Sequence, residues 1–490
     1  MTNAPPSVIV TLPARTAADA RREIEEAAID RADGAEIRVD RWSPAERAGA
    51  LGLFPSPLPL WATYRSTAEG GEGFDEPAVR AHELAALAEL PFARIDLELE
   101  RDLPLQAELA RVLHRPGAPG LVVSRHLPHG TSAEALRATT AADVPAGALR
   151  KVVFEAGVAE LVTQFWSELP RPADGPFVIH STGASAELLR ALGRSLGMAS
   201  VFASPGSDRV RAPVQAGQIP VDLLADYFHH EPPGPLFALV GHPLRHSRSP
   251  ALHARWMKRA DLSGLYLRLE IAQAHDLAAT LVRLPGLGFR GLNVTLPLKI
   301  PALALATEAS PAAERAGCAN TLTFTGEEIQ AENTDVPAFD RRLGELRRHD
   351  SVAADRVTVL GAGGAARAAL TVVSGQGLEA EVLARDPAAA GALAREFGAE
   401  LRRPETRRPA QLLVHATPAG SEEMPGLEVP LRPLLGPGTY VVDYVVAPHH
   451  RFLEQEARAR GGRYEDGGRL LEYQAAESFA IWWGRPPPES

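Results

Sequence analysis

A lysine inside an apolar stretch is the first residue of this sequence with reactive potential. Lys151 lies in 149–154 (LRKVVF), a run typical of a buried strand. An unpaired ammonium there is costly, so this environment favours the free amine, which can attack a ketone. The imine that forms is an electron sink, and it stabilises the carbanion left when a base removes a neighbouring proton. Lys151 therefore indicates imine chemistry on a carbonyl substrate.

His126 is the candidate base for that chemistry. It ends the apolar run 120–126, where an imidazole can remove a proton and later protonate a departing hydroxyl. Glu98, in the preceding apolar run, is the carboxylate that we expect to orient His126. A lone histidine after a strand is more often a loop or capping residue, so this role depends on Lys151. We expect no role for the nearby His129.

A glycine-rich turn marks a second centre of chemistry. The apolar run 357–360 leads into Gly361-Ala-Gly363-Gly364-Ala365 and then into a helical pattern. Glycines permit a tight turn and let backbone amides approach a pyrophosphate at a helix N-terminus. A second strand, 380–386, ends about 20 residues further on, as dinucleotide-binding folds require. We expect Gly361, Gly363, Gly364 and Ala365 to bind the cofactor.

The end of that second strand gives opposite indications about the cofactor. An acidic residue there holds a ribose hydroxyl, as in NAD binding, whereas an arginine holds the 2′-phosphate of NADP. Arg385 and Asp386 supply both. We expect NADP with Arg385 as a ligand and keep NAD as the alternative. Arg385 is equally consistent with a solvated surface residue.

Two α/β folds are needed to position these residues. Residues 7–228 alternate eight apolar runs with amphipathic stretches, which predicts an N-terminal (β/α)8 barrel with Lys151 on its sixth strand. The active sites of such barrels lie at the C-terminal strand ends, where His126 falls. The proline-rich segment 229–235 is typical of a linker, and a second alternating α/β region follows it.

We divide the chain into three parts. Residues 1–230 form the barrel, residues 236–345 with 468–490 form a substrate-binding α/β lobe, and residues 350–467 form a Rossmann lobe. The expected architecture is therefore an α/β chain in which a barrel precedes a two-lobed dinucleotide-binding unit.

Composition excludes several other classes of protein. The 490 residues are 45% hydrophobic with a net charge of −10 and no long basic run, which argues against nucleic acid as a partner. No apolar stretch approaches the roughly 20 residues of a membrane span, and the first residues lack the pattern of a secretion signal. The single cysteine, Cys318, excludes an internal disulfide and a cysteine-based zinc site. We expect a cytoplasmic protein without a metal.

Four short stretches ahead of the glycine turn complete the second centre. They are 241–250 (GHPLRHSRSP), 291–299 (GLNVTLPLK), 317–322 (GCANTL) and 333–335 (NTD). In this order, and with Gln474 near the C-terminus, they resemble shikimate dehydrogenase from about residue 236 onward. The resemblance implies nicotinamide-dependent reduction of a ring ketone.

The side chains in these stretches suit that reaction. Lys299 can deliver a proton to the oxygen as hydride reaches carbon, and Asp335 can orient its ammonium and tune its pKa. Outside this context they would be a surface lysine and a helix cap. A substrate carboxylate and ring hydroxyls need several further polar partners, for which we expect Ser247, Ser249, Asn293, Thr295, Asn320 and Gln474.

Two positions depart from the family pattern. Val446 stands where the family has a tyrosine after its last Rossmann strand, which leaves the choice between shikimate and quinate open. The usual Asn-Arg-Thr after the second strand is Ala384-Arg385-Asp386, which leaves the choice between NADP and NAD open.

The barrel half resembles type I 3-dehydroquinate dehydratase. The matching pieces run in the family's order: 36–40 (EIRVD), 64–65 (YR), 69–71 (EGG), 96–98 (DLE), 124–126 (SRH), Lys151 and Arg190. The resemblance implies a Schiff base on Lys151, with substrate bound by Glu36, Arg38, Arg65, Arg190 and Gln218. Arg38 and Arg65 are expected near Lys151, where their charges would lower its pKa. The lid, 214–218 (VQAGQ), keeps Gln218 but lacks the family's serine and proline.

The two resemblances support each other, since the product of the first reaction is the substrate of the second. They imply a bifunctional enzyme that converts 3-dehydroquinate through 3-dehydroshikimate to shikimate. The alternatives are a quinate- or shikimate-directed dehydrogenase with a weak or inactive dehydratase domain, and a ligand-sensing regulator. The regulator predicts lost catalytic residues, yet Lys151, His126, Lys299 and Asp335 are all present. The sequence does not indicate an oligomeric state or substrate channelling.

Overall fold

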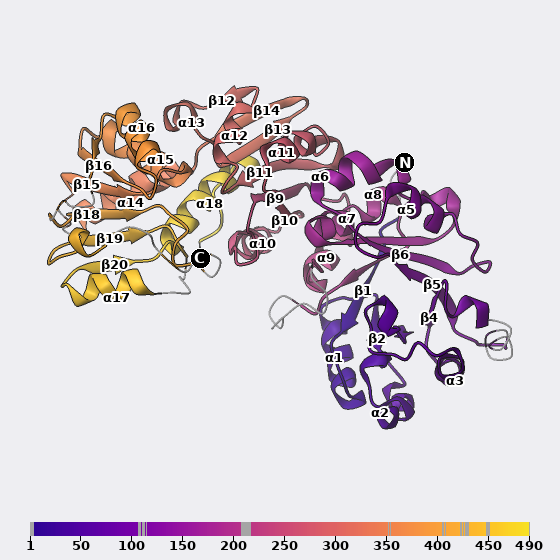
Figure 1. Ribbon diagram of the computed structural model, residues 1–490. Coiled ribbons are helices and arrows are strands. Elements are labelled where there is room, and N and C mark those ends of the chain that lie inside the picture. The colour runs from indigo at the N-terminus through magenta and orange to yellow at the C-terminus, as the bar shows by residue number, and fades with distance from the viewer. Residues whose placement is uncertain are drawn as a thin grey trace. The chain divides into compact units, whose positions relative to one another are not determined.

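The computed structural model describes residues 4–489 except 106–108, 110–112, 114, 207–216, 351, 353, 404, 405, 407, 422, 423, 425, 427–430 and 447–450. The chain folds into two compact units (Figure 1). One contains the residues up to Pro235 together with Ser263–Leu269, which include most of β10 (Leu265–Glu270). The other contains Leu236–Leu262 and the residues from Glu270 onward.

The first unit is a barrel of eight parallel strands in the order β7-β6-β5-β4-β3-β2-β1-β8, which confirms the predicted fold class. The strands are β1 (Ser7–Leu12), β2 (Gly34–Arg38), β3 (Leu60–Thr63), β4 (Arg94–Glu98), β5 (Gly120–His126), β6 (Leu149–Glu155), β7 (Phe177–Thr182) and β8 (Ser200–Ala203). The helices between and after them are α1 (Ala17–Ile29), α2 (Pro44–Ala48), α3 (Pro77–Ala88), α5 (Ala133–Thr140), α6 (Val158–Glu160), α7 (Ala186–Ala191), α8 (Gly193–Leu196) and α9 (Val221–Phe228).

Every second side chain of a strand points into the barrel, so the inward-pointing side chains of the eight strands form layers. One layer is an apolar cluster of Ile9, Trp61, Val122, Leu149, Val178 and Phe202. Two residues further along the same strands, toward their C-terminal ends, lies a polar layer that contains Thr11, Thr63, Ser124, Lys151, His180 and Ser204. The apolar layer fills the barrel, and the polar layer above it can face a substrate.

The second unit contains two sheets. In the first, β9, β11, β13, β14 and β12 lie side by side in that order, and β13 is antiparallel to both of its neighbours. Its elements are β9 (Leu236–Gly241), α10 (Ser249–Arg259), α11 (Ala274–Leu281), β11 (Phe289–Val294), α12 (Lys299–Ala304), β12 (Glu308–Ala309), α13 (Pro311–Ala316), β13 (Thr321–Thr325) and β14 (Glu328–Glu332). Helix α14 (Asp335–Arg348) leads to the other sheet, and α18 (Gly468–Trp483) packs against both α10 and α14.

The other sheet is parallel, with the order β17-β16-β15-β18-β19-β20. Numbered along this lobe, the order is 3-2-1-4-5-6, which defines a Rossmann fold and places its ligand crevice at the carboxyl ends of β15 and β18. Its elements are β15 (Arg356–Leu360), α15 (Gly364–Gly375), β16 (Glu379–Leu383), α16 (Pro387–Phe397), β17 (Glu400–Leu401), β18 (Leu412–His415), β19 (Tyr440–Asp443), α17 (Phe452–Ala459) and β20 (Arg463–Glu465). Within the described residues, every helix is too short or too polar to span a bilayer.

Candidate active sites

Lys151 lies in the polar layer of the barrel and is 6% exposed. Its Nζ donates to Glu36 Oε1 at 3.1 Å and to Asp96 Oδ2 at 3.2 Å. The same nitrogen lies 4.1 Å from the centroid of the Phe202 ring. The lysine therefore points into the barrel, where two carboxylates from β2 and β4 stabilise its buried charge.

Glu36 is fixed by neighbours on both sides. Its two oxygens accept hydrogen bonds of 2.8 Å from Thr11 and Thr63. Burial alone would raise its pKa, but the charges of Lys151 and Arg38 outweigh burial and lower the pKa of Glu36 to about 2. Glu36 is therefore an anion that holds Lys151 in place.

Arg38 and Arg65 do not present unpaired charge to Lys151. Arg38 donates to both oxygens of Asp40 at 2.8 Å. The fully buried Arg65 pairs with Asp96 and Glu69 and, at 3.3 Å, with Glu98. Asp96 Oδ2 accepts from both Arg65 and Lys151, so it couples the two cations.

The partner of His126 is Glu69, so the expectation that Glu98 orients the imidazole is wrong. Glu69 Oε2 lies 3.1 Å from His126 Nδ1 and accepts the backbone N–H of His126 at 3.0 Å. Both oxygens of Glu98 accept instead from Ser66, through its backbone N–H at 2.8 Å and its hydroxyl at 2.7 Å. Glu98 fixes the turn after β3, and Glu69, which lies in that turn, reaches the histidine.

This geometry determines the state of His126. Because a carboxylate only accepts, Nδ1 carries the proton and Nε2 keeps the lone pair of a base. Desolvation and the charge of Arg65 lower the pKa of His126 to about 4, although the bond to Glu69 opposes this shift. Burial raises the pKa of Glu69, but its bond to His126 and the charge of Arg65 prevail and lower it to about 2. His126 is thus neutral, oriented and available as a base at neutral pH.

Arg190 is buried, although it lies on the short helix α7. It is 1% exposed, and its guanidinium donates to the backbone carbonyls of Phe202, Ser181 and Ala186. No described carboxylate lies within ion-pair distance of it, and burial lowers its pKa to about 10. A buried guanidinium held by carbonyls alone is suited to an anionic ligand.

Gln218 also faces this region. It is 7% exposed, its amide nitrogen donates to Thr11 at 3.2 Å, and its buried Oε1 has no partner in the part of the chain that is described. The preceding lid residues Val214, Gln215 and Ala216 lie outside the described residues.

The second unit contains a cavity of about 660 Å³. Its lining includes every residue that the sequence assigns to the dehydrogenase site except Arg385: Ser247, Ser249, Asn293, Thr295, Lys299, Asn320, Asp335, Gly361, Gly363, Gly364, Ala365 and Gln474. These residues come from both sheets of the unit and from α18, so the cavity lies between the lobe of β9 and the Rossmann lobe.

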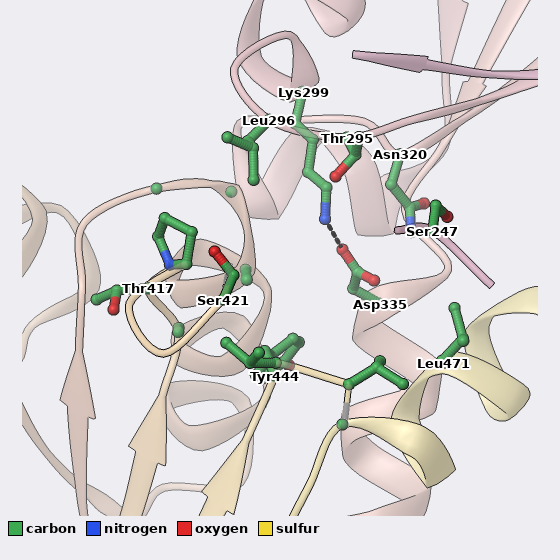
Figure 2. A pocket seen from close by; sticks show the side chains of 18 of the residues that line it. Ser247, Thr295, Leu296, Lys299, Asn320, Asp335, Thr417, Ser421, Tyr444 and Leu471 are labelled. Atoms are coloured by element: carbon green, nitrogen blue, oxygen red, sulfur yellow. Dashed lines mark hydrogen bonds and ion pairs between the residues drawn. The ribbon is translucent and has the colours of Figure 1, made fainter. Parts of the chain in front are cut away.

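Lys299 and Asp335 point toward each other in the middle of this cavity (Figure 2). Nζ of Lys299 lies 2.6 Å from Oδ2 of Asp335, a short charge-assisted bond. Lys299 is the first residue of α12, and Asp335 is the first residue of α14. Two helix starts therefore position one ion pair.

The polar side chains around this pair are themselves held by hydrogen bonds. Asn320 Oδ1 accepts from the backbone N–H of Thr334 at 2.7 Å, one residue before Asp335. Asn293 Nδ2 donates to Thr321 at 3.1 Å, and Gln474 Nε2 donates to the carbonyl of Leu471 at 3.0 Å. Ser247 and Asn320 flank the Lys299–Asp335 pair on one side of the cavity (Figure 2). A ring with several hydroxyls can be bound by such a set.

The glycine turn has the shape that a dinucleotide needs. Gly361 has φ +125°, and a Cβ there would lie 2.7 Å from the carbonyl oxygen of Ala416. A Cβ at Gly363 would meet no atom of the described residues within 4 Å, so among them open space lies over the N-terminus of α15. The first residues of this twelve-residue helix therefore offer backbone amides to a pyrophosphate.

The end of β16 is consistent with a cofactor phosphate. Arg385 is exposed, whereas the carboxylate of Asp386 caps α16 by accepting the backbone N–H of Ala388 at 2.9 Å. The carboxylate of Asp386 is therefore engaged by the start of α16, whereas the side chain of Arg385 is exposed at the end of β16.

Sequence reasoning missed several residues of the Rossmann lobe. Thr417 lines the cavity, and its hydroxyl lies 2.6 Å from His415 Nε2, while His415 Nδ1 lies 2.8 Å from Asp443. Tyr444 also lines the cavity beside Val446, and its buried hydroxyl has no partner among the described residues. The hydrophobic pattern that marks β18 and β19 gives no sign of these polar contacts.

Fold and sites together define the class of protein. A lysine held by carboxylates inside a (β/α)8 barrel is joined to a two-lobed, dinucleotide-dependent dehydrogenase unit. Residues 8–231 match the family model described as type I 3-dehydroquinase, and residues 239–322 match the shikimate dehydrogenase substrate binding domain. The chain is 40% identical to the shikimate dehydrogenase (NADP(+)) of Acidiphilium cryptum over 51% of this chain and 91% of that protein. The chain belongs to the shikimate dehydrogenase family and also carries a type I 3-dehydroquinase domain.

Two solved structures are similar as well. Shikimate 5-dehydrogenase of Thermus thermophilus, in complex with NADP(H) and shikimate, is 37% identical and covers 52% of this chain and 95% of its own, with a TM-score of 0.47. Dehydroquinate dehydratase and shikimate dehydrogenase from S. pombe are 20% identical and cover 99% of this chain and 96% of their own, with a TM-score of 0.42.

Proposed function

We propose that this chain dehydrates 3-dehydroquinate to 3-dehydroshikimate in the barrel and reduces 3-dehydroshikimate to shikimate in the second unit. The observation that carries the proposal is that both units contain reactive side chains suited to these two steps. The barrel contains the buried Lys151 and Arg190 together with His126, and the second unit has a Lys299–Asp335 pair in a cavity that the glycine turn also lines.

In the barrel, Lys151 adds to the ring ketone and forms an imine. The iminium withdraws electrons, and Nε2 of His126 removes the proton from the neighbouring carbon. Glu69 stabilises the imidazolium that results. His126 then returns the proton to the departing hydroxyl, and water releases the product from Lys151. Arg190 and Gln218 bind the carboxylate and hydroxyl groups of the substrate. Glu36, Arg38 and Arg65 complete the charged lining of this substrate site.

In the second unit, Lys299 and Asp335 supply the proton for ketone reduction. Lys299 donates to the carbonyl oxygen as that oxygen gains charge, and Asp335 keeps the ammonium aimed at it. Ser247 and Ser249 bind the substrate carboxylate, while Asn293, Thr295, Asn320 and Gln474 bind its hydroxyls.

The cofactor is NADP. When bound, it supplies or accepts the hydride. Gly361, Gly363, Gly364 and Ala365 hold its pyrophosphate, and Arg385 holds the 2′-phosphate. Two observations support this choice over NAD: the capping role of Asp386 and the NADP(+)-dependent naming of the relatives.

The finer organisation is also a proposal. Residues 236–345 with 468–490 bind the substrate, and residues 350–467 bind the cofactor. A cytoplasmic location is supported by the single cysteine, which suits a reducing compartment.

The reductase half is tested by mixing the protein with 3-dehydroshikimate and following the absorbance of NADPH or NADH. We expect consumption of NADPH and formation of shikimate. The same assay in reverse, with shikimate or quinate and either oxidised cofactor, separates the shikimate enzyme from a quinate-directed one. Failure to turn over either polyol would exclude the dehydrogenase function.

A further inference from the structure

His180 is a buried histidine to which the reactions above give no role. It lies on β7, is 2% exposed and follows Val178 of the apolar layer by two residues, so it belongs to the polar layer. Lys151 follows Leu149 of the same apolar layer by two residues on the adjacent strand β6. In the β6–β7 ladder Lys151 pairs with Val178, so His180 projects into the barrel two residues beyond the partner of Lys151, toward the C-terminal strand ends.

Phe202 brings these two side chains together. The His180 and Phe202 rings meet edge to face, with centroids 5.7 Å apart and an interplanar angle of 83°. Nζ of Lys151 lies over that same Phe202 ring at 4.1 Å. An imidazole and an amine thus share one aromatic surface inside the barrel.

One ring nitrogen of His180 is left for a ligand. Its Nε2 is shielded from solvent and has no hydrogen-bond partner among the described residues. A buried polar atom without a hydrogen bond lowers the stability of the fold. Such an atom in a native structure is explained when a bound ligand supplies the missing hydrogen bond.

His180 is buried beside two cations. Burial, together with the charges of Arg190 on α7 and Lys151 on β6, lowers the pKa of His180 well below its ordinary value. No carboxylate of the described part of the chain opposes this effect. His180 is consequently a neutral imidazole, and a proton transferred to it is readily released again.

We propose that His180 is a second catalytic imidazole, which transfers the proton during imine formation on Lys151. This inference rests on the lysine-imine chemistry proposed for the barrel. His180 first takes one proton from the Lys151 ammonium, and the free amine then adds to the ketone, so that the C–N bond forms and the carbonyl electron pair moves onto oxygen. His180 returns its proton to that oxygen, which becomes the carbinolamine hydroxyl. It then takes one of the two protons left on nitrogen and gives it to the hydroxyl. The C–O bond then breaks, water leaves, and the nitrogen lone pair forms the C=N bond.

The strand order explains how two imidazoles can catalyse different proton transfers at the same substrate. Strand β6, which carries Lys151, lies between β5 and β7 in the barrel. His126 ends β5 and His180 lies on β7, and both pair with Val153 of β6, two residues beyond Lys151. His126 serves the carbon next to the imine, and His180 serves the imine carbon and its departing oxygen.

The test measures how fast Lys151 forms a trappable imine. Protein is mixed with 3-dehydroquinate, quenched with borohydride at a series of times, and the modified Lys151 peptide is quantified by mass spectrometry. In His180→Leu and His180→Gln we expect imine formation at least tenfold slower than in the unaltered protein. His126→Asn is expected to trap at close to the unaltered rate while making no product. His129→Leu, which removes an exposed histidine of the same barrel, is the matched control and should change nothing.

Each outcome decides between named alternatives. An unaltered trapping rate in His180→Leu would overturn the proposal and leave the lysine-imine function standing. The glutamine of His180→Gln can form hydrogen bonds but cannot act as a base. An unaltered trapping rate in that variant would show that His180 acts only through hydrogen bonds, and this result would also overturn the proposal. Absence of any trapping in the unaltered protein would instead remove the proposed dehydratase function itself.

Discussion

Glu69 Oε2 contacts His126 twice, at Nδ1 and at the backbone N–H, with distances of 3.1 and 3.0 Å. This double contact fixes the ring and leaves Nε2 as the base. The carboxylate arrives from the turn after β3, whereas the histidine ends β5. The dyad therefore exists only when the barrel has closed this part of its sheet.

Replacing Glu69 by glutamine tests its positioning role. We expect kcat of the dehydratase to fall about 100-fold, the lower end of what a general base contributes. Because Glu69 holds the pKa of His126 up against burial, the acidic limb of kcat/KM should also move below pH 4. The measurement is a pH series with 3-dehydroquinate. Glu98→Gln is the matched control, and a limb that moves equally in both variants would contradict the assignment.

Lys299→Met is the sharpest variant of the reductase site. Loss of the proton donor should lower kcat for 3-dehydroshikimate reduction about 10²- to 10⁴-fold, with a much smaller effect on KM. Steady-state kinetics with NADPH measure both constants. Asp335→Asn should act in the same direction, since it removes the partner 2.6 Å from Nζ. The exposed lysine Lys258 provides the control: an equal loss in Lys258→Met would show that the effect is not specific.

Acid should weaken the barrel in two stages. The pKa of His126 is about 4 in the fold, below its ordinary 6.5, so the unfolded chain binds a proton first as pH falls. Stability is therefore lost from about pH 6.5 down to about 4. Below pH 4.5 the carboxylates of Glu36 and Glu69, with folded pKa values of about 2, add further loss.

Urea unfolding of the whole chain at a series of pH values measures this dependence. His126→Asn should reduce the loss of stability between pH 6.5 and 4, and His180→Leu should reduce it as well. His129→Asn, at an exposed position, should leave the profile unchanged. A profile that is insensitive to both buried histidines would show that their burial does not govern acid stability.

Gly291 provides a test of the packing between β11 and α18. A Cβ at this position would lie 2.1 Å from Trp482 Nε1 and 2.8 Å from the carbonyl oxygen of Leu322. Gly291→Ala should therefore destabilise the second unit by about 1–3 kcal/mol through overpacking. A Cβ at Gly286 would meet no described atom within 4 Å, so Gly286→Ala should be neutral or slightly stabilising. Denaturant titration compares the two, and equal effects would contradict this account of the packing.

Much of the fold could be predicted because it is local in the sequence. The hydrophobic periodicity of each element lies in consecutive residues, so it can be recognised in the sequence. This holds for the eight apolar runs of the barrel and for the strand, glycine turn and helix around Gly363. The Lys299–Asp335 pair could be predicted because both residues lie in short motifs of a family with a specific order.

The partners inside the barrel were harder to predict, since they are set by three-dimensional neighbours. Glu69 and Glu98 are both acidic residues ahead of His126, and nothing local distinguishes the one in the turn from the one on the strand. Arg190 lies on a helix whose sequence pattern is amphipathic, yet the short helix packs its guanidinium onto carbonyls of β7 and β8. Its burial follows from barrel closure, which is a non-local event.

The central claim is that one chain performs two successive steps, and a single assay addresses it. The protein is given 3-dehydroquinate and NADPH, and consumption of NADPH is followed together with the formation of shikimate. We predict both for the unaltered chain. Lys151→Ala should lose activity with 3-dehydroquinate yet keep it with 3-dehydroshikimate, and Lys299→Met should accumulate 3-dehydroshikimate. If the unaltered chain consumes no NADPH with either substrate, or if Lys151→Ala still converts 3-dehydroquinate, the account is wrong.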